Sequence, residues 1–304
     1  MRTASPSPPP DQRGQAPSRA LIDVLRLSTE YLAQHGSPTA RLDAELITAH
    51  ALRLRRLDLY LQHDRPLAEP ELAAVRHLLR RRAAAEPVAY ITGVREFFGR
   101  PFAVTPDVLI PRPETEALVE VALRVLRSGG NAGGVLPHVA DLGTGSGCIA
   151  VTLAAEMPGL LVSAVDASGA ALHVARQNAE RNGVADLVTF SLGDWAQGLD
   201  EPADVVVSNP PYVTTGELGE LDRGIREYEP HAALDGGDDG LAAYRELLAS
   251  LGAHLRQSAA VLLEIDPRRV AAVRSVAVAA FGDVDASVHR DLAGRDRVLE
   301  LRLR

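Results

Sequence analysis

Four residues that end an apolar run carry the most evident chemistry of this sequence. Residues 205–208 read Val-Val-Val-Ser and lead directly into Asn209, Pro210, Pro211 and Tyr212. Because proline has no backbone N–H, the two prolines cannot continue a sheet ladder, and the pattern predicts a strand that ends at Asn209. A carboxamide beside a backbone carbonyl offers two acceptors to one planar –NH2 group, and a tyrosine ring offers a flat face to stack on it. We therefore predict a site that holds a planar nitrogen for methylation.

A glycine-rich segment stands where another predicted strand gives way to a helix. It reads Asp141-Leu142-Gly143-Thr144-Gly145-Ser146-Gly147, and the expected cofactor contacts in it are Asp141, Gly143, Thr144, Gly145 and Gly147. A dinucleotide-binding fingerprint would need its last glycine at Cys148, so the spacing differs from that motif. The leading acid would repel a pyrophosphate but suits a cofactor with a cationic amino-acid end. S-adenosylmethionine meets this description, and a plain glycine turn is the alternative.

Two further acids follow the next two predicted strands. Asp166 stands close to the spacing at which an acid binds ribose hydroxyls in nucleotide folds, although it could also cap a helix that begins near Ser168. Asp194 could accept the exocyclic amine of adenine, with Trp195 packing nearby, and an aspartate of a surface turn is the alternative. Asn209 is expected to contact the cofactor as well as the substrate.

The part of the chain that holds these residues alternates strands and helices. The hydrophobic pattern predicts strands at 138–142, 160–166, 187–191, 203–208, 259–265, 284–289 and 297–303, and helices at 147–156, 168–182, 240–256 and 267–281. Such alternation predicts an α/β, Rossmann-like fold, in which a seven-stranded and mostly parallel sheet is covered by helices on both faces. The carboxyl ends of parallel strands meet at one edge of a sheet, so the residues named above should gather there.

The rest of the chain divides by composition. Residues 1–18 are rich in proline and serine, with almost nothing apolar, and predict a disordered tail. Residues 19–86 show helical periodicity without a strand signal and predict a small helical bundle. Residues 87–110 carry β-rich runs with glycine turns and predict a β-hairpin linker. The catalytic domain is expected over 111–304, opening with a helix that continues to about Arg127.

Composition narrows the functional classes. The chain has 304 residues, a net charge of −8 and one cysteine, and no apolar run approaches the length of a membrane span. The single cysteine excludes an internal disulfide and favours a cytoplasmic location. The acidic balance argues against a nucleic acid substrate, and the nine histidines lack metal-ligand spacing, so no metal is expected. The run Arg80–Arg82 predicts a solvated helix face, with contact to a partner or to RNA as the alternative.

With these residues in hand, the chain resembles the HemK-type family of N5-glutamine methyltransferases. The resemblance extends from about Leu21 to the C-terminus. It is densest in the segments 86–93 (Glu-Pro-Val-Ala-Tyr-Ile-Thr-Gly), 109–116 (Leu-Ile-Pro-Arg-Pro-Glu-Thr-Glu), 141–147, 207–212, 229–237 and 291–297 (Asp-Leu-Ala-Gly-Arg-Asp-Arg). The chain differs from the usual pattern at residues 256–258, at Asp266, where the family usually has glycine, and at Arg269, near where it has glutamine.

The resemblance implies a class I S-adenosylmethionine-dependent methyltransferase fold and a substrate. The substrate would be the glutamine of a Gly-Gly-Gln loop in a peptide chain release factor, whose body would dock on the helical domain. Asn209, Pro210 and Tyr212 would be catalytic, and Pro211 and Glu114 would complete the substrate pocket. For Glu114, capping of a helix N-terminus is the alternative. The segment 213–235 would form a lid over the site.

Two other functions are compatible with parts of the pattern. An amino-methyltransferase acting on nucleic-acid bases, or on a glutamine of another protein, could use the same Asn-Pro-Pro-Tyr segment. A non-catalytic cofactor-binding module would be expected to have a degraded glycine loop or Asn-Pro-Pro-Tyr segment, and both are intact here.

Overall fold

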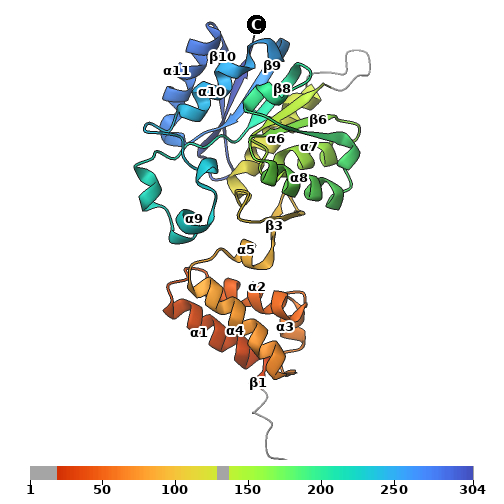
Figure 1. Ribbon diagram of the computed structural model, residues 1–304, viewed down its shortest axis with the longest axis vertical. Coiled ribbons are helices and arrows are strands. Elements are labelled where there is room, and N and C mark those ends of the chain that lie inside the picture. Colours follow the sequence, from red (N-terminus) through yellow and green to blue (C-terminus); the bar gives the residue numbers. More distant parts are fainter. Residues whose placement is uncertain (1–18, 129–136, 304) are drawn as a thin grey trace, which may run out of the picture. The chain divides into compact units, whose positions relative to one another are not determined.

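The computed structural model describes residues 19–128 and 137–303, which fall into two compact units. One unit is Met1–Thr92 and the other is Gly93–Arg304. Figure 1 shows the helices and strands of both units. The tail expected over 1–18 lies outside the described residues.

The first unit is helical, as its periodicity predicts. Its elements are α1 (Leu21–Gln34), α2 (Ala40–Leu52), α3 (Asp58–Leu61), α4 (Glu69–Ala83), α5 (Val88–Thr92) and the two-residue strands β1 (Arg19–Ala20) and β2 (Pro66–Leu67). One apolar cluster joins α1, α2 and α4 through residues such as Leu25, Ile47 and Leu79. The β1–β2 pair corrects the expectation of a unit without strands. Two residues per strand are too short to leave an alternating pattern.

The helix α5 corrects the expectation of extended structure from residue 88. The carbonyl of Pro87 accepts the N–H groups of both Tyr90 and Ile91, which starts a helical turn. That turn buries both side chains, and packing of this kind outweighs the β propensity of the local sequence. The hairpin itself is present but shorter than expected, with β3 (Val94–Phe97) paired antiparallel to β4 (Arg100–Ala103).

The arginine run on α4 is less solvated than its sequence indicates. Arg81 forms an ion pair with Glu86 at 2.5 Å, and Arg82 pairs with the buried carboxylate of Asp43 at 2.7 Å. Only Arg80 is fully on the exposed side. Two of the three guanidinium groups therefore serve the internal packing of the bundle.

The second unit contains the predicted sheet. Its strands are β5 (Val139–Leu142), β6 (Val162–Asp166), β7 (Val188–Leu192), β8 (Ala203–Ser208), β9 (Leu255–Glu264), β10 (Asp285–Arg290) and β11 (Asp296–Arg302). Their order is β10-β11-β9-β8-β5-β6-β7. The pairs among β5 to β9 are parallel, whereas β11 is antiparallel to both β9 and β10. All seven predicted strands are confirmed within a few residues, apart from an earlier start of β9.

Helices cover both faces of this sheet (Figure 1). Along the central strands, alternate residues belong to two different apolar clusters. Val139 of β5 packs in the cluster that contains α6 (Glu116–Ser128) and α7 (Cys148–Glu156). The next residue, Ala140, packs in the cluster that contains α10 (Ala242–Leu251) and α11 (Val270–Phe281). The predicted doubly wound arrangement is thus confirmed.

The remaining helix boundaries follow the sequence closely. The helix α8 (Gly169–Arg181) matches its predicted range, and the short 3-10 helix η1 (Pro113–Thr115) precedes α6 as the proline pattern predicts. The helix α10 is shorter than expected because it ends before Gly252, and β9 already begins at Leu255. Among the described residues, no helix is both long and apolar enough to span a bilayer.

The chain reverses direction across the sheet between β5 and β8. From β5 it runs outward through β6 and β7, and it then returns to place β8 on the other side of β5. Ligands of open α/β folds bind at the carboxyl ends of strands flanking such a point. The two ends are joined by a buried hydrogen bond of 2.6 Å from the hydroxyl of Ser208 to the carbonyl oxygen of Leu142.

One buried amide joins the hairpin to the sheet. The Oδ1 atom of Asn178, on α8, accepts the N–H of Ala103 at 2.6 Å, and its Nδ2 atom donates to the carbonyls of Ala103 and Ser146 at 3.0 and 2.8 Å. Asn178 is completely buried and Ala103 is half-buried, so without these bonds the amide and the Ser146 carbonyl would lack a partner away from water.

Replacing Asn178 with alanine should therefore destabilise the second unit. We expect the free energy of unfolding to fall by about 2–3 kcal/mol, because one buried and two half-buried backbone groups lose their partner. Urea denaturation followed by circular dichroism measures this change. The matched control is Gln177→Ala on the exposed side of the same helix, which should change stability by less than about 0.5 kcal/mol. Equal effects of the two variants would contradict the role given to Asn178.

Candidate active site

Two cavities meet at the point where the sheet changes direction. The larger, of about 500 Å³, is lined by the glycine loop after β5, the ends of β6 and β7, and Asn209, Pro210 and Pro211. The smaller, of about 410 Å³, is lined by the same three residues from the other side, by Tyr212 and by the segment that follows it. The residues after β8 therefore form a wall common to both cavities, which we call the larger and the smaller cavity below.

The glycine loop is folded by its backbone. Gly143, Gly145 and Gly147 all have positive φ values, which only glycine adopts readily. Gly143, Thr144 and Gly145 line the larger cavity. Gly147 instead lies against α8, where an added Cβ would stand 3.1 Å from that of Ala175. The first two glycines thus admit a ligand close to the main chain, and the third allows two helices to pack closely.

Asp141 lies beneath this loop and is completely buried. Its Oδ2 atom accepts hydrogen bonds from the hydroxyl of Thr144 at 2.7 Å and from the N–H of Ala150 at 3.1 Å. The Oδ1 atom has no partner among the described residues. Burial raises the pKa of this carboxyl to about 7, although the two hydrogen bonds act in the opposite direction. Asp141 is not among the residues that line either cavity, so the structure presents Thr144 to the larger cavity and holds it from below.

Asp166 lies at the end of β6 and lines the larger cavity. One carboxylate oxygen accepts the N–H of Gly145 at 2.8 Å, and the other accepts the N–H of Ser168 at 2.9 Å. The helix α8 is capped by the hydroxyl of Ser168 and not by Asp166, so the capping alternative for this acid is wrong. Each oxygen of Asp166 keeps a lone pair for a further donor in the cavity.

Asp194 and Trp195 lie farther along the same cavity. Asp194 is exposed, and Trp195 has a φ of 51°, an uncommon conformation for a bulky residue. The indole N–H donates to Glu246 at 3.3 Å, and the ring lies over Gly143, where an added Cβ would be 3.6 Å away. Strained backbone of this kind is often found beside ligands.

The residues after β8 are held from two directions. The Nδ2 atom of Asn209 donates to the hydroxyl of Thr115 at 3.2 Å. Beyond Tyr212, the chain pairs with residues near Gly236, where an added Cβ would lie only 2.9 Å from the carbonyl oxygen of Pro211. Burial raises the pKa of Tyr212 to about 12, so its phenol stays neutral and cannot serve as a base at neutral pH.

Two charged residues that the sequence analysis did not single out close the wall between the cavities. Arg112 lines both, and its guanidinium donates to the buried carboxylate of Glu229 at 2.6 Å. Glu229 also accepts the N–H of Ile110 at 3.1 Å. The segment 109–116 is thereby fastened to the lid segment 213–235. The only signal in the sequence was that both residues belong to dense segments of the family resemblance.

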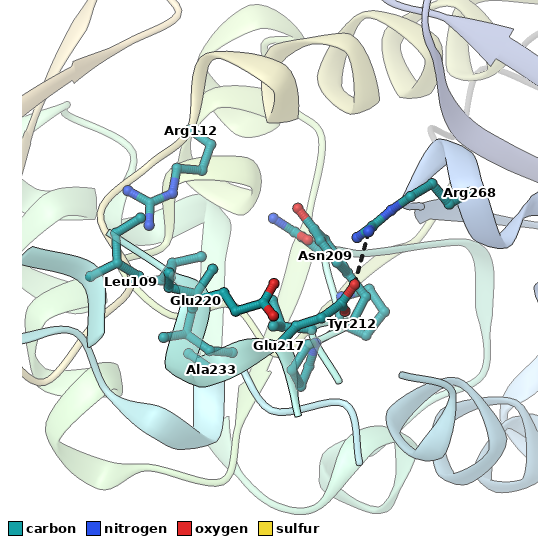
Figure 2. A pocket seen from close by; sticks show the side chains of 14 residues that line it. Leu109, Arg112, Asn209, Tyr212, Glu217, Glu220, Ala233 and Arg268 are labelled. Atoms are coloured by element: carbon teal, nitrogen blue, oxygen red, sulfur yellow. Dashed lines mark hydrogen bonds and ion pairs between the residues drawn. The ribbon is translucent and has the colours of Figure 1, made fainter. Parts of the chain in front are cut away.

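The lid segment carries further charge into the smaller cavity. Figure 2 shows Arg112 and Arg268 on opposite sides of this cavity, with Glu217 and Glu220 on the lid between them. Glu114, expected to be a pocket wall, is not among the residues lining either cavity and lies 3.5 Å from the guanidinium of Arg295. Helix capping by Glu114 is likewise not observed.

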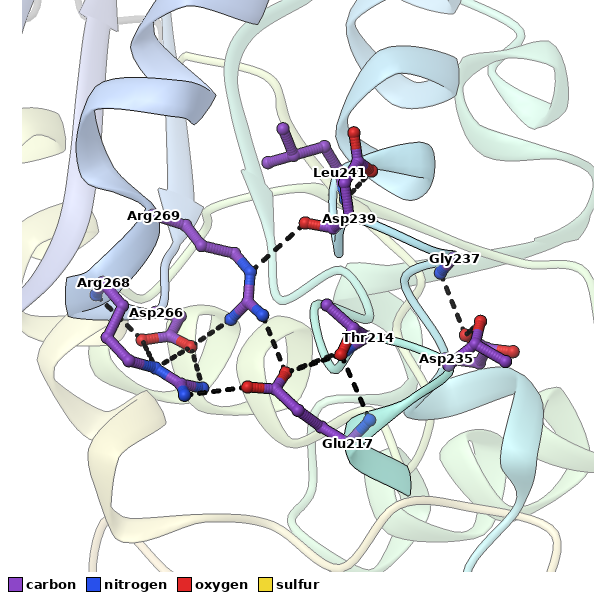
Figure 3. A network of polar contacts seen from close by, with 10 residues as sticks. Thr214, Glu217, Asp235, Gly237, Asp239, Leu241, Asp266, Arg268 and Arg269 are labelled. Carbon is purple, nitrogen blue, oxygen red and sulfur yellow. Dashed lines mark hydrogen bonds and ion pairs between the residues drawn. The ribbon is translucent and has the colours of Figure 1, made fainter. Parts of the chain in front are cut away.

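A polar network anchors the lid to the loop after β9 (Figure 3). Glu217 accepts from Thr214 and forms ion pairs with Arg268 at 2.8 Å and with Arg269 at 2.7 Å. Both arginines also pair with Asp266. The hydrogen bonds from Thr214, followed by the one from Arg269, lower the pKa of Glu217 to about 2.

Comparisons with known proteins identify the family of this chain. Residues 23–93 match the family model described as the PrmC N-terminal domain, and residues 135–221 match the methyltransferase small domain. The release factor glutamine methyltransferase of Geobacter sulfurreducens is 42% identical over 280 residues, which cover 91% of this chain and 94% of the relative. The chain belongs to the release factor glutamine methyltransferase family. A relative of the same description from Cereibacter sphaeroides is 43% identical, with 92% of this chain and 98% of the relative covered.

Solved structures support the fold. The human METTL16 catalytic domain, crystallised with an RNA hairpin, matches 70% of this chain and 79% of its own, with a TM-score of 0.51 and 17% identity. Asp266 and Arg269, two positions at which the sequence analysis expects a departure from the family resemblance, both belong to the network that anchors the lid.

Replacing Glu217 with glutamine should loosen the lid of this methyltransferase. We expect backbone amides of residues 213–221 to exchange with deuterium faster by roughly a factor of five, since two ion pairs are lost. Because the pKa of Glu217 is depressed when folded, its stabilisation is present above about pH 4.5 and is lost as the pH falls toward 2.

The difference in melting temperature between the parent protein and the Glu217→Gln variant should accordingly become smaller as the pH is lowered below about 4.5. The control is Glu227→Gln, which removes an exposed ion pair with Arg223 on the same lid. A change as large in the control would show that the network around Glu217 has no special role.

Proposed function

We propose that this chain transfers a methyl group from S-adenosylmethionine to the side-chain amide nitrogen, N5, of the glutamine in the Gly-Gly-Gln loop of peptide chain release factors. The observation that carries the proposal is the wall formed by Asn209, Pro210 and Pro211 between two cavities, one for each reactant. Curated relatives that match more than nine tenths of the chain bear the name of this activity.

The larger cavity has the polar groups that S-adenosylmethionine requires. Asp166 would accept the ribose hydroxyls with the lone pairs left free by its backbone hydrogen bonds. Asp194 would accept the adenine amine, with Trp195 beside it, and Gly143, Thr144 and Gly145 would surround the amino-acid end. We assign Asp141 and Gly147 an indirect part, because each supports the loop from below. The cofactor supplies a methyl group already activated by the positive sulfur.

The work of the protein is then to orient a weak nucleophile. The lone pair of an amide nitrogen is delocalised into its carbonyl, so the nitrogen attacks poorly unless it is held in line with the methyl group. The side-chain oxygen of Asn209 and the carbonyl oxygen of Pro210 would accept its two N–H groups, and Tyr212 would pack on the amide plane. Positioning of this kind can lower a barrier by roughly 7–11 kcal/mol in favourable cases. The nitrogen loses one proton after it is methylated, and no strong base is needed beforehand.

The helical unit would bind the body of the release factor. Its helices α2 and α3 leave several large apolar side chains exposed, namely Leu42, Leu46, Leu57, Tyr60 and Leu61. Apolar side chains gathered on neighbouring elements are typical of surfaces that bind another protein. Peptide chain release factors act in the cytoplasm, which is the location that we propose for this protein. The single cysteine of the chain, Cys148, is free and buried in the fold.

A nucleic-acid base is the second candidate for the planar nitrogen. The net charge of −8 disfavours it, since binding to nucleic acid rests mainly on cationic contacts to phosphate. Two of the three arginines in the run on α4 are also occupied by internal carboxylates.

The deciding experiment is methyl transfer from labelled S-adenosylmethionine to a purified release factor. The control substrate is the same factor with its Gly-Gly-Gln glutamine replaced by alanine. We expect label only on the unaltered factor. Label on both factors would disprove the target residue, and label on RNA but on neither factor would favour the second candidate.

Within this function, Asn209→Ala should lower the rate far more than the affinity for the cofactor. We expect kcat to fall by at least about a hundredfold, as for the loss of a group that orients the reacting atom. Affinity for S-adenosylmethionine, measured by calorimetry, should change less than about threefold, which is under 1 kcal/mol. Asn182→Ala, at the end of α8 and outside both cavities, is the control. Equal losses of rate and cofactor affinity would disprove the role of Asn209.

A further inference from the structure

The orientation of the Asn209 side chain is not fixed by its own chemistry. A carboxamide can turn by half a rotation at little cost, which exchanges its oxygen and its nitrogen. If the nitrogen faced the substrate, two N–H donors would oppose each other, and the amide could not be held. The proposed transfer, on which this inference rests, therefore needs a device that keeps the Asn209 oxygen toward the smaller cavity.

The contact that could provide this is with Thr115. The Thr115 hydroxyl, 2% exposed, lies 3.2 Å from Asn209 Nδ2. A hydroxyl can both donate and accept, so Thr115 alone would tolerate either orientation of the amide. Which orientation of the Asn209 amide Thr115 favours depends on the acceptor to which the Thr115 hydroxyl donates its hydrogen.

A buried carboxylate lies next to that hydroxyl. Glu264, the last residue of β9, is completely buried, and neither of its oxygens has a hydrogen-bond partner among the described residues. Burial raises the pKa of this carboxyl to about 7, and the hydroxyl of Thr115 is the first of the groups that oppose the shift. An ionised carboxylate only accepts, so it takes the hydroxyl hydrogen and leaves Thr115 able only to accept from Asn209. Contacts of this kind are often long without substrate and shorten in the complex.

We propose that Thr115 and Glu264 are positioning residues that hold the Asn209 amide with its oxygen toward the substrate nitrogen. Glu264 accepts a hydrogen bond from Thr115, and Thr115 accepts one from Asn209. When Glu264 is protonated it can itself donate to Thr115. The hydroxyl then donates to the Asn209 oxygen, and the amide turns to the unproductive orientation.

Several charged and titratable groups act on Glu264. Arg297 on β11 and Arg112 favour its ionised form, whereas Glu114 opposes it. The phenol of Tyr244 on α10 donates to the backbone carbonyl of Glu264 and not to its side chain. The remaining neighbours, whose own pKa values the Glu264 charge raises, are Tyr212 and Cys148. After Thr115, the guanidinium groups of Arg297 and Arg112 contribute most to keeping the carboxyl ionised.

The test compares Thr115→Val with Thr115→Ser in release factor methylation. Valine has the shape of threonine without the hydroxyl, and serine keeps the hydroxyl. We expect kcat to fall by at least about tenfold for valine and to stay within about threefold of the parent for serine, with cofactor affinity unchanged in both. Thr152→Val, which removes a buried hydroxyl of α7 that lines neither cavity, is the control for the loss of a buried hydroxyl.

The second arm uses Glu264→Gln, which keeps the shape of the side chain but does not titrate. The parent kcat at saturating cofactor should rise as the pH increases through about 7, and the variant should lose that dependence. Asp141 is unchanged in this variant, so a pH dependence that persists would come from another group and would overturn the role of Glu264. Equal rates for the valine and serine variants would overturn the role of Thr115. An inactive parent would instead reject the proposed function.

Discussion

The site depends on one buried hydrogen bond, from the hydroxyl of Ser208 to the carbonyl oxygen of Leu142. The parallel ladder between β5 and β8 ends with Asp141 opposite Val207, one residue before this bond. Without this hydrogen bond, the segments that follow β5 and β8 could separate as soon as the ladder ended. With it, the glycine loop and Asn209 leave the sheet side by side. The two cavities share a wall for this reason.

Buried carboxylates recur around that wall, and they do not serve stability in a simple way. Asp141, Glu229 and Glu264 are all nearly or completely buried, and removing such groups from water is unfavourable. Glu229 recovers part of this cost through Arg112 and a backbone N–H. Asp141 keeps one oxygen and Glu264 keeps both without a partner among the described residues. Buried acids in this condition at the ends of central strands favour a functional role over a stabilising one.

The sequence predicted the architecture well because long apolar runs and alternation are local signals. The pattern predicts all seven strands and the long helices between them, and also the convergence of Gly143, Asp166 and Asn209 at one sheet edge. It does not predict the short helix α9 (Arg223–Tyr228). The features that the sequence does not predict all depend on contacts between residues that are not neighbours in the chain. The helix α5 forms through tertiary burial of Tyr90 and Ile91, which outweighs local propensity. The partners Arg112 and Glu229 stand 117 residues apart, and Asn209 and Thr115 stand 94 apart, so no local pattern could pair them.

The three hydrogen bonds of Asn178 have a thermodynamic consequence. They connect the end of the hairpin at Ala103 with the glycine loop at Ser146, so the order of one segment contributes to the order of the other. A ligand that orders the loop must then also favour the ordered hairpin. By reciprocity, whatever steadies the hairpin must strengthen binding at the loop by the same factor. The hairpin and a small molecule held at the glycine loop are therefore coupled through a single side chain, that of Asn178.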